Sequence, residues 1–147
     1  MVSMGEDNMT DQKVINNKLR DLNKYLKQLR KYENINKEEL ENDLDKLWIV
    51  ERGLQLSIQT ILDIGTHILS EKGIVIEKYS DVFKKLVNEN ILPEHFGNKI
   101  KGMAGFRNVL VHEYADVETN IIIKVLNNSL DDFVKYAKYI NDFLENN

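Results

Sequence analysis

Hydrophobic residues recur every three to four positions along most of the chain, which is the spacing of an amphipathic α-helix. Near the N-terminus this spacing is kept by Ile15, Leu19, Leu22, Leu26 and Leu29. No stretch of the sequence shows a competing alternation of apolar and polar residues, the pattern of a half-buried strand. The sequence therefore predicts an all-α protein, an up-and-down bundle of about five helices with short connections.

Capping residues mark the expected ends of these helices. Asn36, followed three residues later by Glu39, has the pattern of a capping box. A long helix is expected from there to Gly73, because glycine favours the backbone conformation that ends a helix. Three further helix starts are expected at Ser80, Pro93 and Asp116.

The long helix is expected to bury one apolar face. Its apolar positions at helical spacing are Leu44, Leu47, Trp48, Leu54, Ile58, Ile61, Leu62, Ile68 and Leu69. Gly53 and Gly65 lie among them, and a residue without a side chain allows a bend or a close approach of a neighbouring helix. We therefore expect a bend or tight packing at these two positions.

Length and composition set the frame for this bundle. Residues 1–10 are polar and acidic and are predicted to be a disordered lead-in, with residues 11–147 forming a single domain. The absence of cysteine excludes disulfides and thiolate metal sites. No signal pattern or membrane-spanning run is recognisable, so a cytoplasmic protein is expected. The net charge of -4 argues against a large non-specific nucleic-acid surface, although a small basic groove stays compatible with it.

Two polar residues interrupt the apolar stripe of the long helix. Glu51 and Gln55 lie where a core would favour leucine, and a buried carboxylate is costly unless it is paired or hydrogen-bonded. They lie either at a helix edge or dimer rim, or in a polar pocket facing Arg107. Asp63 and His67, one turn apart, form either a surface pair or part of a cleft.

Metal chemistry has little support in the sequence. The three histidines, His67, His95 and His112, are scattered, and none belongs to a pair with the helical spacing of metal ligands. We therefore predict no metal site and no bound cofactor.

The segment "RNVLVHEY" concentrates polar side chains in an otherwise apolar run. On a helical wheel Arg107 and Tyr114 point almost the same way, whereas His112 lies about 140° from Arg107, on the side of Asn108. The natural local neighbours are therefore Arg107 with Tyr114 and Asn108 with His112. Arg107 and His112 can converge if the helix ends or distorts near His112, or if a second subunit contributes. A purely structural role at a helix end is the alternative.

With an arginine, four residues, a histidine, one residue and a tyrosine, the segment has the R-x4-H-x-Y signature of HepT-like HEPN proteins. The chain resembles this family of small helical bundles, which includes prokaryotic ribonuclease toxins. The flanking segments are also similar, namely "ERGLQLSIQTILDIGTHIL", "YSDVFKKLVNENIL" and "IKGMAGFRNVLVHEYADVE". The resemblance extends from about Leu19 to Leu144, nearly the whole chain.

The resemblance implies a homodimer whose motif helices line a shared cleft. It implies a metal-independent endoribonuclease toxin of a type VII-like toxin–antitoxin pair, with tRNA as the family-level expectation for its RNA substrate. The implied antitoxin is a minimal nucleotidyltransferase, MntA, which silences the toxin by transferring AMP from ATP to the motif tyrosine. ATP is then used by the partner and not by this chain. The implied roles are catalytic for Arg107 and His112 and AMPylated for Tyr114, with Asn108 as the polar residue between them. From the residue pattern itself, Asn108, Glu51 and Asp63 are predicted to support this site.

These residue types suit RNA cleavage, because RNA carries its own nucleophile, the 2′-hydroxyl. His112 can transfer a proton near neutral pH, and Arg107 offers a planar charged fork to phosphate oxygens. Lys99 and Lys101 extend this phosphate track or are ordinary surface lysines. The rival functions are a catalytically silent HEPN binding subunit of a nucleotidyltransferase complex and a purely structural dimerisation domain.

Overall fold

A computed structural model of the protein describes residues 4–111 and 118–146, with side chains from Asp11 onward. Every regular element in these two segments is helical, which confirms the predicted all-α class. None of the described helices is both long and apolar enough to traverse a lipid bilayer. The first helix begins at Met4, inside the segment predicted to be a disordered lead-in, and therefore starts earlier than expected. In chain order the elements are α1 (Met4–Arg30), α2 (Lys37–Asn42), α3 (Leu44–Glu71), the 3-10 helix η1 (Tyr79–Asp81), α4 (Val82–Asn88), α5 (Glu94–Ile100), α6 (Met103–Val111), α7 (Thr119–Asn128) and α8 (Leu130–Glu145).

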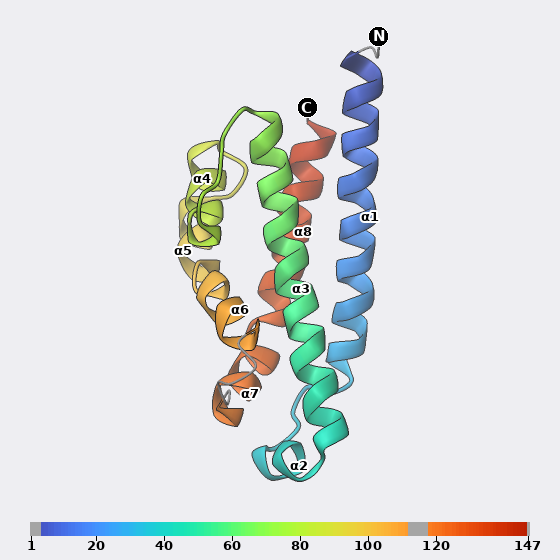
Figure 1. Ribbon diagram of the computed structural model, residues 1–147, viewed down its shortest axis with the longest axis vertical. Coiled ribbons are helices and arrows are strands. Elements are labelled where there is room, and N and C mark those ends of the chain that lie inside the picture. Colours follow the sequence, from blue (N-terminus) through green and yellow to red (C-terminus); the bar gives the residue numbers. More distant parts are fainter. Residues whose placement is uncertain (1–3, 112–117, 147) are drawn as a thin grey trace.

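The long helices α1, α3 and α8 lie side by side and form the body of the molecule (Figure 1). The shorter helices α4, α5 and α6 lie on the side of α3 that is opposite α1, and α2 and α7 lie at the end remote from both termini. Helix α3 is thus central, with α1 packed on one side and α6 on the other. This position allows side chains of α3 to orient those of α6.

The structure has more helices than the predicted five or so, because short breaks divide three of the expected segments. Asp43 ends α2 with an extended backbone, and its carboxylate accepts a hydrogen bond from the backbone N–H of Lys46 at 3.2 Å. The same residue thereby caps α3. Lys101 and Gly102 separate α5 from α6, and Ser129 separates α7 from α8.

The predicted helix ends are partly confirmed. The side chain of Asn36 accepts a hydrogen bond from the backbone N–H of Glu39 at 2.7 Å, as a capping residue should. Gly73 follows α3 with a φ angle of 77°, the left-handed conformation that glycine tolerates. The prediction for Ser80 is wrong, since Ser80 lies inside η1 and α4 has no side-chain cap. Asp116 lies outside the described residues.

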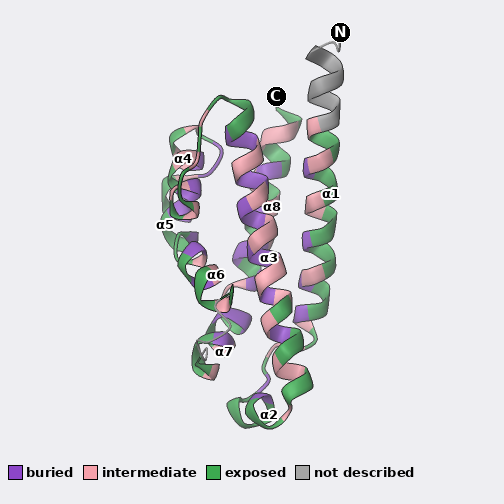
Figure 2. Ribbon diagram, viewed as in Figure 1, coloured by how far each residue is buried: buried purple, intermediate pink, exposed green. Residues whose placement is uncertain are grey.

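The core follows the predicted apolar face of α3 over most of its length (Figure 2). The prediction is wrong at the start of the helix, where Leu44 and Trp48 are 54% and 60% exposed. The first turns of α3 extend beyond the end of α1 and lie beside the short helix α2, which covers little surface. The predicted residues that are buried are Leu54, Ile58, Ile61, Leu62, Ile68 and Leu69.

The two glycines of α3 mark tight packing. A Cβ atom at Gly65 would lie 2.5 Å from Cγ1 of Val82 and 3.0 Å from the hydroxyl oxygen of Tyr136. A Cβ atom at Gly53 would lie 2.7 Å from Cδ2 of Leu29. Both glycines therefore allow a neighbouring helix to approach α3 closely, which confirms the expected close packing.

Candidate functional site

Arg107 lies on α6 and reaches across to α3. It is half-buried, and its Nε–H donates a hydrogen bond to Oε1 of Gln59 at 2.8 Å. Its Nη1 donates to Oδ1 of the neighbouring Asn108 at 3.1 Å. A guanidinium group has five N–H donors. The two amides use one donor each and so fix the plane of the group while leaving its other donors for a ligand. Both partners are neutral, and neither cancels the positive charge of Arg107.

Gln59 connects Arg107 to two further side chains. Its Nε2 donates to Oδ1 of Asp63 at 2.8 Å and to the hydroxyl oxygen of Tyr79 at 3.3 Å. These contacts turn the amide so that its oxygen faces Arg107. The guanidinium carbon of Arg107 lies 5.1 Å from the centroid of the Tyr79 ring, a cation–π distance. We call Gln59, Asp63, Tyr79, Arg107 and Asn108 the arginine network.

The arginine network holds one cationic group from three elements, α3, η1 and α6. Its carboxylate, Asp63, contacts Gln59, whose amide lies between Asp63 and Arg107. Arg107 thus keeps its charge in a fixed orientation. A planar guanidinium presented in this way is suited to bind a phosphate group through two parallel hydrogen bonds.

The structure brings two of the predicted supporting residues to Arg107. Asn108 contacts it directly, and Asp63 contacts it through Gln59. His112 and Tyr114 lie outside the described residues. The expected pairs of Arg107 with Tyr114 and of Asn108 with His112 therefore stay predictions.

The polar position opposite Arg107 is Gln59, not Gln55. Gln55 instead accepts a hydrogen bond from Nη1 of Arg52 at 3.2 Å. Glu51 is half-buried two turns before Gln59, and its supporting role stays a prediction. Gln59 follows Glu51 and Gln55 at steps of four residues, so the three lie on one face of the helix. This spacing could have identified Gln59 from the sequence. Tyr79 has no such signal, because it enters the site from a separate 3-10 turn.

Asp63 and His67 do not form the expected pair. Asp63 contacts Gln59, whereas Nε2 of His67 lies 3.3 Å from Oδ1 of Asp11 and 3.4 Å from Oε1 of Glu71. Burial and the neighbouring Asp11 carboxyl raise the pKa of Glu71 to about 7. His67 therefore belongs to a second polar cluster, formed by α1 and the C-terminal end of α3.

Lys99 and Lys101, read from the sequence either as RNA contacts or as ordinary surface lysines, differ in their surroundings. Nζ of Lys99 lies 3.1 Å from Oδ1 of Asp132, a residue of α8 that is only 7% exposed. Lys101 is exposed in the turn between α5 and α6 and lines a pocket of about 510 Å³ together with Lys84. The structure thus gives Lys99 a structural partner, and both contacts with RNA stay predictions.

The amino-acid sequence is similar to a known protein family and to two known nucleases. Residues 22–140 match the model of the family described as Ribonuclease HepT-like. The chain is 33% identical over 132 residues to the tRNA nuclease HepT of Aphanizomenon flos-aquae, a match that covers 89% of this chain and 90% of that protein. It is 30% identical over 88 residues to the mRNA nuclease HepT of Shewanella oneidensis, covering 59% and 66% of the two chains.

Solved structures with a similar fold include the tri-AMPylated HEPN toxin of Shewanella oneidensis in complex with its MNT antitoxin. The TM-score is 0.78 at 23% identity, over 88% of this chain and 97% of the toxin. The cytosolic protein of unknown function YutE from Bacillus subtilis has a TM-score of 0.80 at 20% identity, over 92% of each chain. At these identities the similarity shows a shared HEPN-like fold.

Proposed function

The chain belongs to the HepT-like ribonuclease family, and on this premise we propose that it is the endoribonuclease toxin of a toxin–antitoxin pair. We further propose that it cleaves RNA without a metal ion in the reaction. Its preferred substrate is tRNA, because the relative that matches almost the whole chain is named a tRNA nuclease. The relative named an mRNA nuclease matches a shorter part of the chain.

The observation that carries this proposal is the arginine network around Arg107. An arginine held by two neutral amides and an aromatic ring keeps its charge and loses little freedom when it binds a phosphate. In RNA cleavage the guanidinium would stabilise the negative charge that builds up on the phosphoryl oxygens. Its fixed plane favours one approach of the RNA backbone.

The proton transfers are assigned to His112 by the motif. The 2′-hydroxyl of RNA attacks the adjacent phosphorus, and the bond to the 5′-oxygen of the next nucleotide breaks. One proton leaves the nucleophile and one is added to the leaving oxygen, both of which an imidazole can carry near neutral pH. In a homodimer two copies of His112 can serve one substrate, which also brings His112 to Arg107 across a two-fold axis.

The regulatory part of the proposal concerns Tyr114. The solved relative described as a tri-AMPylated toxin in complex with an MNT antitoxin supports an equivalent nucleotidyltransferase partner for this chain. AMP attached to Tyr114 would add a phosphodiester charge and a bulky base beside Arg107. Both would occupy the place of the RNA backbone and block cleavage.

The decisive experiment is cleavage of total tRNA by the purified protein in EDTA, after intact mass has shown Tyr114 to be free of AMP. We expect cleavage by the wild type and its loss in Arg107→Ala and His112→Ala. The matched control is Arg52→Ala, which removes an exposed arginine of α3 that contacts Gln55 and should leave cleavage unchanged. Absence of cleavage by the unmodified, dimeric wild type would favour a silent binding subunit instead. Preferential cleavage of mRNA would refute the choice of tRNA.

A further inference from the structure

Three potential metal ligands from two helices converge at one end of the bundle. Asp11 comes from α1, and His67 and Glu71 come from the last turns of α3. Their nearest ligand atoms all lie within 4.8 Å of one another. Each side chain is about one-third exposed, so the cluster is accessible to an ion without being freely solvated.

The distances from His67 to the two carboxylates are long for hydrogen bonds. One nitrogen, Nε2 of His67, contacts both carboxylates, at 3.3 Å for Asp11 and 3.4 Å for Glu71. Charge-assisted N–H···O bonds are shorter, about 2.7–2.9 Å, and one N–H could serve both carboxylates only as a bifurcated bond with two long arms. In a tetrahedral zinc site with ligand bonds of about 2.0–2.1 Å, neighbouring ligand atoms lie about 3.3–3.4 Å apart. The two separations from Nε2 of His67 have this length.

The geometry points to a binding site for one divalent transition-metal cation, of which Zn²⁺ is the model, held by Asp11, His67 and Glu71. Imidazole nitrogen and carboxylate oxygen are both zinc ligands, and two negative charges offset the charge of the ion. An imidazole ligand suits Mg²⁺ poorly, because this ion prefers oxygen ligands.

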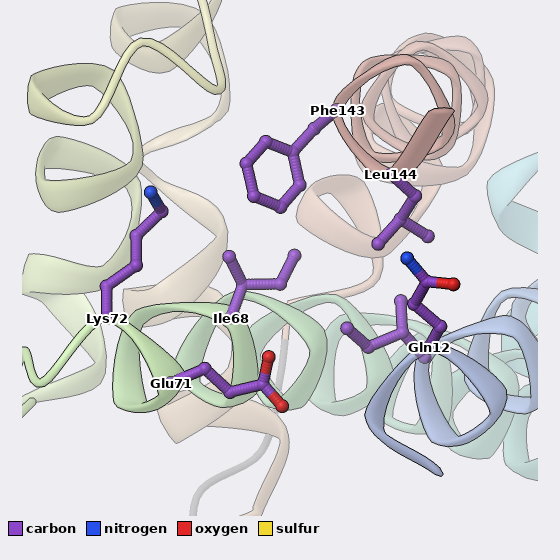
Figure 3. A pocket seen from close by; sticks show the side chains of 7 residues that line it. Gln12, Ile68, Glu71, Lys72, Phe143 and Leu144 are labelled. Carbon is purple, nitrogen blue, oxygen red and sulfur yellow. The ribbon is translucent and has the colours of Figure 1, made fainter. Parts of the chain in front are cut away.

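A fourth ligand has room beside the cluster. Glu71 also lines a pocket of about 240 Å³ between α1, α3 and α8, which Gln12, Phe143 and Leu144 help to form. Figure 3 shows Glu71 extending on the side of α1, whereas Lys72 is directed away from it toward Phe143. Water entering from this pocket can complete a tetrahedral site without competition from the ammonium group.

The role of such an ion would be structural. It would join the N-terminal part of α1 to the end of α3. Within the described residues, His67 shares no hydrogen bond or ion pair with the arginine network. It follows Asp63 by one turn of α3, about 6 Å along the helix axis, and Gln59 by two turns, about 12 Å. The inference therefore does not rest on the proposed ribonuclease activity, and metal-free RNA cleavage is compatible with it.

The test is titration of EDTA-stripped protein with ZnCl₂, followed by calorimetry and thermal melting. We expect one zinc per chain, and a melting temperature raised by about 5–10 °C when free zinc is about 100 times its dissociation constant. Asp11→Asn, His67→Gln and Glu71→Gln should each weaken binding at least about tenfold. His95→Ala, which removes an exposed histidine of α5, should not, and MgCl₂ should not replace zinc.

Two outcomes would overturn the site. One is the lack of saturable zinc binding by the stripped wild type. The other is unchanged affinity in Asp11→Asn and Glu71→Gln, which would place any bound zinc elsewhere. Cleavage of tRNA by the same variants in EDTA, well below their melting temperatures, should stay at the wild-type rate. Its loss in every protein, wild type included, would count against the ribonuclease proposal and not against the metal site.

Discussion

Gln59 is the residue whose importance the structure reveals most directly. Its amide oxygen accepts the Nε–H of Arg107 at 2.8 Å, and its amide nitrogen donates to Asp63 and Tyr79. The change Gln59→Leu removes both functions and nearly preserves the volume of the side chain. Arg107 would keep its charge, its contact with Asn108 and its stacking on Tyr79. It would lose the hydrogen bond that fixes the plane of the guanidinium from α3.

The expected loss of activity follows from this single bond. A hydrogen bond to a charged group contributes about 1.5–3 kcal/mol, and each ~1.4 kcal/mol of transition-state stabilisation corresponds to about a tenfold change in rate. We therefore expect kcat/KM for tRNA cleavage to fall about 10- to 100-fold. Most of the loss should be in kcat, because a misaligned guanidinium still attracts the phosphate in the ground state.

The assay compares Gln59→Leu with Gln55→Leu in EDTA, using protein free of AMP. Gln55 is the same residue type one turn earlier on α3 and contacts Arg52, so its replacement should leave kcat unchanged. The second comparison repeats Gln59→Leu in an Arg107→Lys background. Lysine lacks the guanidinium plane that Gln59 orients, so Gln59→Leu should have little further effect in this background.

Gln59 does not position Arg107 if Gln59→Leu cleaves tRNA within about twofold of wild type while Arg107→Ala is inactive. The same conclusion holds if Gln59→Leu lowers the rate equally in the Arg107→Lys background, since Gln59 would then act independently of Arg107. Thermal melting of each variant separates these outcomes from simple unfolding.

Two further predictions concern stability. Gly65→Ala should destabilise the protein by about 1–3 kcal/mol, because the new Cβ atom would lie 2.5 Å from the side chain of Val82 in α4. Gly105→Ala should instead stabilise it by about 0.5–1 kcal/mol, because a Cβ atom there would meet no other atom within 4 Å. Urea unfolding measures the change in the free energy of unfolding for both variants. If both changes had the same sign, close packing at Gly65 would not be what sets its stability. Lys99→Ala should lower stability by about 1 kcal/mol, because it leaves the nearly buried Asp132 without its partner, whereas Lys101→Ala should not. A drop in tRNA affinity for Lys99→Ala at unchanged stability would instead support its predicted contact with RNA.

The sequence by itself determined the fold class and the family. Apolar residues repeat every three to four positions over most of the chain. This period predicts helices whatever the arrangement in which the helices pack against one another. Asn36 and Gly73 are capping residues whose local chemistry is sufficient to end a helix, and the structure confirms both. The motif that begins at Arg107 is also a local pattern, and it led to the family that the comparisons confirm.

The tertiary structure decided which side chains meet, because such contacts join residues far apart in the chain. Trp48 has the spacing of a core residue but is exposed, since α3 extends beyond the helix that would have covered it. Gln59 and Tyr79 reach Arg107 from other elements, and no local pattern records that approach. His67 of α3 contacts Asp11 of α1, not the expected Asp63 of its own helix. Helical periodicity gives the face on which a side chain lies, whereas its partner depends on which helix packs against that face.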